Sequence, residues 1–281
     1  MPRLLLLLLL LLAVSGLVYL RTRMQGEPDS QHAWLPKGWP DALQQIGLFA
    51  IADLCYETVR GISEGNSAVA FSNARDIVHL EQGMGLFFEQ GLQGWVMGSR
   101  LMVDVANFMY VNTHFVVTTA FLVWLYLRHN DRFYFVRNMF MVAMALALVG
   151  YLAMPTAPPR FLPELGFVDT IAYYAEVRHD SAFVTLFFNP YAAVPSMHVA
   201  FSLMVAIPAA LIVRRRVLKL MWCLYPLLVA MVVIVTGNHW WFDAAVGAVV
   251  ALTAALVARL VLSRVRPAAW AWRRRPVTVT A

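Results

Sequence analysis

The sequence is poor in charged residues: Asp, Glu, Lys and Arg make up 14% of its 281 positions. A soluble globular domain carries about 25% charged residues, so a soluble core alone does not explain this composition. Hydrophobic residues make up 60% of the chain, and the mean hydropathy is +0.64. We therefore expect an integral membrane protein, with the bilayer as a partner. The length accommodates six or seven spanning helices of about 20 residues each.

Cysteine is scarce as well, and no nucleic-acid interface is visible. Cys55 and Cys223 are the two cysteines, and both lie in apolar segments. They indicate neither a disulfide framework nor a metal cluster, and no cofactor is expected. The net charge of +6 comes from basic residues at the ends of apolar runs, where they anchor a chain near anionic lipid. No aromatic and basic reading surface accompanies them, so nucleic acid is not expected as a partner.

Five apolar runs dominate the C-terminal two thirds of the sequence. Basic residues are frequent in the gaps 128–137 and 214–219 and in the C-terminal tail, and scarce in the loop 155–192 and the turn 237–240. The positive-inside rule places the basic gaps and the C-terminus in the cytoplasm, and the other two connections on the opposite face. The runs cover about 105–127, 135–154, 193–213, 219–236 and 241–262.

The N-terminal third is less regular. Residues 4–20 begin with nine consecutive leucines and are a signal peptide, a signal anchor or an additional span. Residues 43–61 are apolar but carry Asp53, Glu57 and Arg60, spaced by four and three, on one helix face. We favour a span whose charged face points into the bundle over a helix lying on the surface.

Residues 64–100 contain no uninterrupted apolar run of 18 residues, and their short amphipathic stretches predict helices lying in the membrane interface. The chain divides into an N-terminal hydrophobic segment and linker at 1–42, a membrane domain at 43–264 and a basic cytoplasmic tail at 265–281. The predicted fold is an all-α membrane bundle of six core spans with these interfacial helices. Residues 4–20 are the candidate for one extra helix.

This topology brings three segments together on the outer face: 154–161, 189–202 and 235–247. In the last of them His239 and Asp243 stand four positions apart, which stacks both side chains on one helix face. A carboxylate bonded to one imidazole nitrogen fixes the tautomer and leaves the other nitrogen as nucleophile or base. Taken alone, such a pair is more often an ordinary histidine beside a first-turn aspartate.

The other two segments add groups that suit a phosphate. Pro195 is well placed to open a helix, and the amides of Ser196, Met197 and His198 would then face the outer medium as an anion site. A histidine there can give a proton to an ester oxygen. Arg160 follows two prolines, and its fork can bind two phosphate oxygens. Ionisable groups at a membrane boundary are costly and tend to be functional, so their joint occurrence favours a site.

Taken in order, the motifs A-P-P-R (157–160), P-S-M-H (195–198) and T-G-N-H-W-W-F-D (236–243) resemble the type-2 phosphatidic acid phosphatase (PAP2) superfamily. The detail is closer to its inositol-phosphotransferase branch, the inositol phosphorylceramide synthase-like proteins. The resemblance covers roughly residues 43–262. It implies a metal-independent lipid phosphatase or phosphotransferase.

The resemblance also implies a role for each residue. His239 attacks phosphorus and becomes a phosphohistidine, while Asp243 orients its ring. His198 protonates the departing oxygen and then activates the acceptor, which is water in a phosphatase or an alcohol such as inositol in a transferase. Arg160 and the amides from Ser196 to His198 hold the phosphoryl oxygens.

Three features depart from the superfamily pattern. Ala153 stands where a lysine is expected, Val232 and Val233 replace a Ser-Arg pair, and Met197 replaces a glycine. Two phosphate-binding cations are therefore missing, as is common in the branch with A-P-P-R.

Four residues are candidates for supporting roles. Asn238, Arg178 and His179 are the candidates to compensate for the missing cations. His114 sits in the middle of the run 105–127, where it either lines the site or pairs within the bundle.

We therefore expect an enzyme that acts on a lipid phosphate or phospholipid at the extracytoplasmic face of a bacterial plasma membrane. The residues leave the choice between water and an alcohol acceptor open. One alternative is a transporter with a His and Asp proton relay, which would spread ionisable residues through the membrane depth. The other is an inactive protein that binds lipid headgroups, which the missing cations favour.

Overall fold

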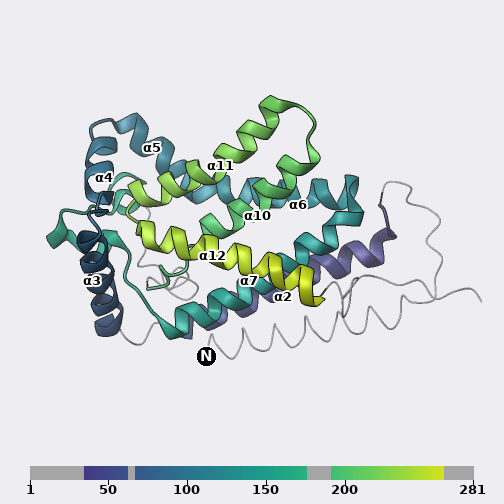
Figure 1. Ribbon diagram of the computed structural model, residues 1–281, viewed down its shortest axis with the longest axis horizontal. Coiled ribbons are helices and arrows are strands. Elements are labelled where there is room, and N and C mark those ends of the chain that lie inside the picture. Colours follow the sequence, from purple (N-terminus) through teal and green to yellow (C-terminus); the bar gives the residue numbers. More distant parts are fainter. Residues whose placement is uncertain (1–34, 63–66, 176–190, 263–281) are drawn as a thin grey trace, which may run out of the picture.

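The computed structural model describes residues 35–62, 67–175 and 191–262 (Figure 1). Within these ranges the chain is all-helical and has no β-strand, which confirms the predicted fold class. The predictions for residues 4–20 and for the basic tail at 265–281 lie outside the described residues.

Each of the five predicted apolar runs is helical. Two π-helical turns, η3 and η6, continue the helices next to them. The elements in order are α2 (Gly38–Ile62), α3 (Ser67–Gly83), α4 (Glu89–Met97), α5 (Arg100–Phe108), η3 (Met109–Thr113), α6 (His114–Arg128), α7 (Asn130–Ala153), η4 (Pro159–Phe161), η5 (Pro163–Leu165), α8 (Thr170–Ala175), α10 (Met197–Ile212), α11 (Arg216–Val235), α12 (Trp241–Val257) and η6 (Ala258–Leu262).

Four of the described helices are long and apolar enough to cross a membrane: Arg100–Arg128, Asn130–Ala153, Arg216–Val235 and Trp241–Leu262. They indicate a membrane protein. The predicted count of six spans is not confirmed. The α10 helix is apolar but has 16 residues, and the 25 residues of α2 include Asp41, Asp53, Glu57 and Arg60.

The long helices pack through small residues. Ala143 of α7, Ala200 of α10 and Ala254 of α12 are fully buried in one core cluster. Small side chains let helix axes approach closely, which is how membrane helices gain packing contacts. The α10 and α12 helices approach each other closely where a Cβ added at Gly247 would collide with the carbonyl oxygen of Ser196. The backbones that carry the two predicted site histidines therefore touch.

A buried polar network fixes the start of α2 against α6 and α7. The carboxylate of Asp41 accepts hydrogen bonds from the hydroxyls of Tyr126 at 2.9 Å and Tyr134 at 2.7 Å, and from the Gln45 amide at 3.2 Å. Arg137 donates from Nη1 to Gln45 at 2.6 Å. Because buried polar groups need partners, this network sets the register of α2, which lies along α7 in Figure 1.

The α3 and α4 helices lie across one end of the bundle, transverse to α7 and α12 (Figure 1). Ala70, Ala74 and Ile77 of α3 are buried in a second core cluster together with Trp240. The indole N–H of Trp240 donates to the carbonyl oxygen of Ala157 at 3.1 Å. Two short helices in this region agree with the expected lack of a span at 64–100, and their position in the membrane interface stays a prediction.

Candidate active site

His239 and Asp243 form the pair that their spacing predicts, but not on one helix face. Trp240 is the N-cap residue and α12 begins at Trp241, so His239 precedes the helix. Its Nδ1 lies 3.2 Å from Oδ2 of Asp243, and the same oxygen accepts the amide hydrogen of Trp240 at 2.9 Å. Both site side chains are buried. One carboxylate oxygen thus caps the helix and orients the imidazole.

His198 is the second residue of α10, and its ring stands next to that of His239. The centroids of the two imidazole rings are 5.8 Å apart, with an angle of 62° between the planes. His198 also stacks on the ring of Tyr110 at 4.6 Å, and the ring of His114 lies 4.6 Å from it. The fold therefore brings the predicted nucleophile, just before α12, next to the predicted general acid in the first turn of α10.

The start of α10 lies close to the expected place, but Pro195 precedes the helix instead of opening it. Ser196 is the N-cap residue and α10 begins at Met197. The Ser196 amide does not face the outer medium, because it donates to the carbonyl oxygen of Asp243 at 3.0 Å across the close contact at Gly247. The Ser196 hydroxyl is buried and has no hydrogen-bond partner among the described residues. From Met197 on, the first-turn amides have no acceptor within the helix.

Arg160 is buried beside the turn that carries His239. Its amide donates to the carbonyl oxygen of Gly237 at 2.9 Å, and its Nη1 donates to Oδ1 of Asn238. Its Nε lies 3.5 Å from Oδ2 of Asp169. Asn238 in turn donates from Nδ2 to the hydroxyl of Thr236 at 2.9 Å. Both ends of the Asn238 amide are engaged, so this side chain orients the guanidinium rather than pointing at a phosphate.

Two amide side chains that the sequence analysis missed tie together the loops around the site. Gln93 donates to the carbonyl oxygens of Val168 at 3.0 Å and Val235 at 3.2 Å, and accepts the Val168 amide at 2.9 Å. Asn107 donates to the carbonyl oxygen of Thr170 at 3.0 Å and accepts its hydroxyl at 2.8 Å. In the sequence both resemble polar residues on a solvated helix face, and no local pattern marks them.

Two buried carboxyl groups, also missed, reach the start of α12 from α3 and α4. Oε1 of Glu89 accepts the amide hydrogen of Trp241 at 3.1 Å, and Oε1 of Glu81 accepts that of Phe242 at 3.3 Å. Both glutamates are fully buried. Burial and the neighbouring charge of Glu89 raise the pKa of Glu81 to about 9. In the sequence of an amphipathic helix, a buried acidic residue cannot be distinguished from one on the solvated face.

The family model of the PAP2 superfamily matches residues 75–257. This range covers well over half of the chain and contains Arg160, His198, His239 and Asp243. The chain belongs to the PAP2 superfamily. Membership suggests phosphatase-type activity in a membrane protein, and it does not single out the inositol-phosphotransferase branch. No curated protein and no solved structure matches the chain.

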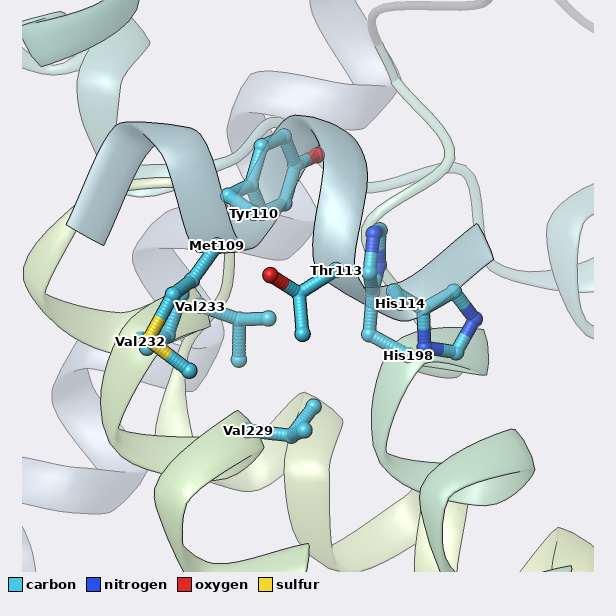
Figure 2. Close-up of a pocket in the computed structure, with 8 residues that line it drawn as sticks. All are labelled: Met109, Tyr110, Thr113, His114, His198, Val229, Val232 and Val233. Carbon is cyan, nitrogen blue, oxygen red and sulfur yellow. The ribbon is translucent and has the colours of Figure 1, made fainter. Parts of the chain in front are cut away.

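A small pocket in this PAP2 superfamily chain lies beside His198 (Figure 2). His114 and His198 stand side by side at one edge, and the side chains of α11 form the opposite wall. The π-helical turn η3 supplies much of the remaining lining, and such turns are frequent at functional sites. Nδ1 of His114 is buried without a partner among the described residues. The lining residues are Met109, Tyr110, Thr113, His114, His198, Val229, Val232 and Val233.

Arg178 and His179 lie outside the described residues. Across the described ranges, no group of three or more His, Cys, Asp or Glu side chains is placed to hold a metal ion. The PAP2 positions at which the superfamily has Ser and Arg are here Val232 and Val233, which form an apolar wall of the pocket.

Proposed function

We propose that the protein is a membrane-embedded enzyme that cleaves a lipid phosphate ester through a phosphohistidine at His239 and passes the phosphoryl group to water or an alcohol. The arrangement around His239 carries the proposal. Asp243 holds its Nδ1 at 3.2 Å, and the ring of His198 stands 5.8 Å away, centroid to centroid. Covalent phosphoryl transfer needs a histidine nucleophile held in one tautomer and a separate general acid.

The first step uses the free ring nitrogen of His239. When Nδ1–H donates to Asp243, Nε2 keeps its lone pair and can attack phosphorus. The N–P bond forms as the P–O bond to the lipid alcohol breaks, and protonated His198 gives its proton to the departing oxygen.

The second step reverses the proton transfer. Neutral His198 takes a proton from water or an alcohol, whose oxygen attacks phosphorus. The N–P bond then breaks, His239 is restored, and His198 is again protonated. A phosphomonoester substrate then gives free phosphate with water and a new phosphomonoester with an alcohol such as inositol. A phosphodiester substrate gives a phosphomonoester with water and a new phosphodiester with an alcohol.

The phosphoryl oxygens would be held by Arg160, by the first-turn amides of α10 from Met197 on, and by the Ser196 hydroxyl. Fixed donors of this kind stabilise the charge that develops in the transition state. Arg160 is partly neutralised by Asp169 at 3.5 Å, and Val232 and Val233 add no cation nearby. A phosphate site with so few cations supports the inositol-phosphotransferase-like branch over the broader superfamily pattern.

The leaving alcohol would lie in the pocket beside His198. A general acid must contact the departing oxygen, so the carbons attached to that oxygen extend into the space next to the imidazole. The walls there are Met109, Val229, Val232 and Val233, which suit an apolar chain better than a sugar. The lipid tail would enter laterally from the bilayer.

We further propose a topology of six spans, with α2 and α10 added to the four long apolar helices. Arginines gather around the α6–α7 junction and around the α10–α11 connection, and both places lie at the helix ends opposite to His239. They are Arg128, Arg132 and Arg137 at the first and Arg214, Arg215 and Arg216 at the second. The positive-inside rule then supports an active site on the extracytoplasmic face and a cytoplasmic C-terminus, in a bacterial plasma membrane.

The test is turnover by purified protein of phosphatidate, polyprenyl diphosphate and phosphatidylinositol, with and without inositol. The change His239→Ala should abolish turnover while the thermal unfolding midpoint stays near that of the wild type. Undiminished turnover in that variant would sink the proposal. Release of free phosphate from phosphatidate identifies a phosphatase, and a new phosphate ester that forms only when inositol is supplied identifies a transferase.

An inactive headgroup-binding protein is the second candidate, because the proposed phosphate site has few cations. Vanadate separates the two: an active site of this type binds it as a phosphoryl mimic and is inhibited. Headgroup binding with no turnover and no vanadate binding would favour the inactive protein.

A further inference from the structure

Three consecutive backbone N–H groups at the start of α12 donate to three carboxyl groups. One carboxyl group belongs to α12 itself, and the other two come from α4 and α3. A helix N-terminus leaves such N–H groups without an intrahelical acceptor. The nucleophile His239 directly precedes this turn, so whatever fixes the turn also fixes the imidazole. The pairs are Trp240 with Asp243 of α12 itself at 2.9 Å, Trp241 with Glu89 of α4 at 3.1 Å and Phe242 with Glu81 of α3 at 3.3 Å.

Glu81 and Glu89 are both fully buried, and neither forms an ion pair with Lys or Arg in the part of the chain that the structure describes. The charged groups that face Glu81 are the carboxylates of Glu89 from α4 and Asp243 from α12. Burial and these like charges raise the pKa of Glu81 to about 9. At neutral pH, therefore, Glu81 holds the turn as a neutral acid.

We propose that Glu81 and Glu89 are positioning residues for phosphoryl transfer: from the transverse helices α3 and α4 they clamp the first turn of α12 and hold His239 in line with phosphorus. The inference rests on the proposed function. Neither glutamate touches substrate or a reacting atom, so both act through His239 and Asp243. A displacement of about 1 Å in an attacking group can cost about 10²-fold in rate.

The clamp depends on the protonation of Glu81. The folded protein favours the neutral acid, because its pKa lies above the ordinary value of 4.5. The stabilisation that the neutral acid gives is fully present below that ordinary value and is lost as the pH rises through about 9. Ionised Glu81 would repel Glu89 and Asp243 at a single helix turn, so the turn should loosen at alkaline pH.

The experiment compares variants of the full-length protein in lipid nanodiscs. Glu81→Leu and Glu89→Leu each leave one first-turn N–H without its acceptor, so kcat should fall about 10- to 100-fold while KM stays within about 3-fold. Glu81→Gln keeps an acceptor and stays neutral, so its kcat should remain within about 3-fold of the wild type at neutral pH. Asp76→Asn, an exposed change on the same helix, is the matched control and should have no effect.

The dependence of kcat on pH distinguishes a role of Glu81 in positioning His239 from a purely structural role. The wild type should lose kcat above about pH 9, whereas Glu81→Gln has no proton to lose at this position. The ratio of kcat for Glu81→Gln to that of the wild type should therefore rise between pH 8 and pH 10. A constant ratio, or normal kcat in both leucine variants, overturns the positioning role.

Hydrogen exchange makes the result independent of catalysis. Amides in a peptide covering residues 236–247 should exchange at least about 10-fold faster in Glu81→Leu and Glu89→Leu, with α7 unchanged. If the wild type turns over no phosphate ester, the proposed function fails and the exchange rates still decide whether the clamp exists. Unchanged exchange at this turn overturns the clamp even when turnover is normal.

Discussion

Oδ2 of Asp243 lies 3.2 Å from Nδ1 of His239 and also accepts the amide hydrogen of Trp240 at 2.9 Å. A single oxygen atom therefore links the orientation of the proposed nucleophile to the start of α12. This link explains why residues four positions apart form a hydrogen-bonded pair here although His239 lies before the helix.

Replacing Asp243 with Asn should lower kcat about 10³- to 10⁴-fold. The amide oxygen can still cap Trp240, but a neutral amide neither selects the required tautomer of His239 nor stabilises its positive charge after attack. Single-turnover kinetics on a lipid substrate measure the effect. A loss below about 10-fold, with the variant folded, would contradict the role of Asp243.

Replacing His198 with Ala should affect substrates according to their leaving groups. A general acid contributes about 10²- to 10⁴-fold when the leaving alcohol is poor, as in a lipid ester. An aryl phosphate such as p-nitrophenyl phosphate releases p-nitrophenolate, which needs no proton to leave. The rate of the first burst of p-nitrophenolate from the variant should therefore stay within about 10-fold of the wild-type rate. Equal losses for both substrates would show that His198 does not protonate the leaving group.

Asn238 should act through Arg160. Arg160→Lys loses the planar fork and should weaken vanadate binding about 10- to 100-fold. Asn238→Ala alone should weaken it less, because the guanidinium remains. The double variant should bind vanadate about as well as Arg160→Lys alone, since neighbouring residues that share a function are not additive. Additive losses would mean that Asn238 contacts the phosphate independently.

Gly247→Ala should destabilise the protein by about 1–3 kcal/mol, because its Cβ would meet the Ser196 carbonyl oxygen and push α12 away from α10. Gly94→Ala on α4 is the matched control, since an added Cβ there has nothing within 4 Å. Thermal unfolding in detergent compares the two. Equal midpoints would show that α10 and α12 do not need this close contact.

The apolar runs, and the proximity of His198, His239 and Asp243, could be predicted from sequence. A spanning helix is a local feature of about 20 residues, so its composition suffices to find it. The pairing of His239 with Asp243 is also local, and the topology brings the segment of His198 to the same face. The predicted six spans stay unconfirmed, because α2 and α10 are each unusual in polarity or length.

The supporting contacts could not be predicted in the same way. Glu81, Glu89 and Gln93 each meet a backbone group far away in the sequence, and no spacing rule reports such a contact. The sequence predicts a free Ser196 amide, but this amide donates to the carbonyl oxygen of Asp243, and only the packed structure shows how closely the two backbones approach at Gly247. The sequence also predicts that Asn238 binds phosphate, because its contact with Arg160 joins segments that are far apart in the chain.

Trapping the phosphorylated intermediate tests the proposed mechanism most directly. Protein mixed with a ³²P-labelled lipid phosphate and quenched in alkali should carry label on His239, with the acid lability of a phosphoramidate. His198→Ala given an aryl phosphate should accumulate more of it, because the second step lacks its base, and His239→Ala should carry none. Continued turnover with no labelled His239, or with the label on another residue, would contradict the mechanism.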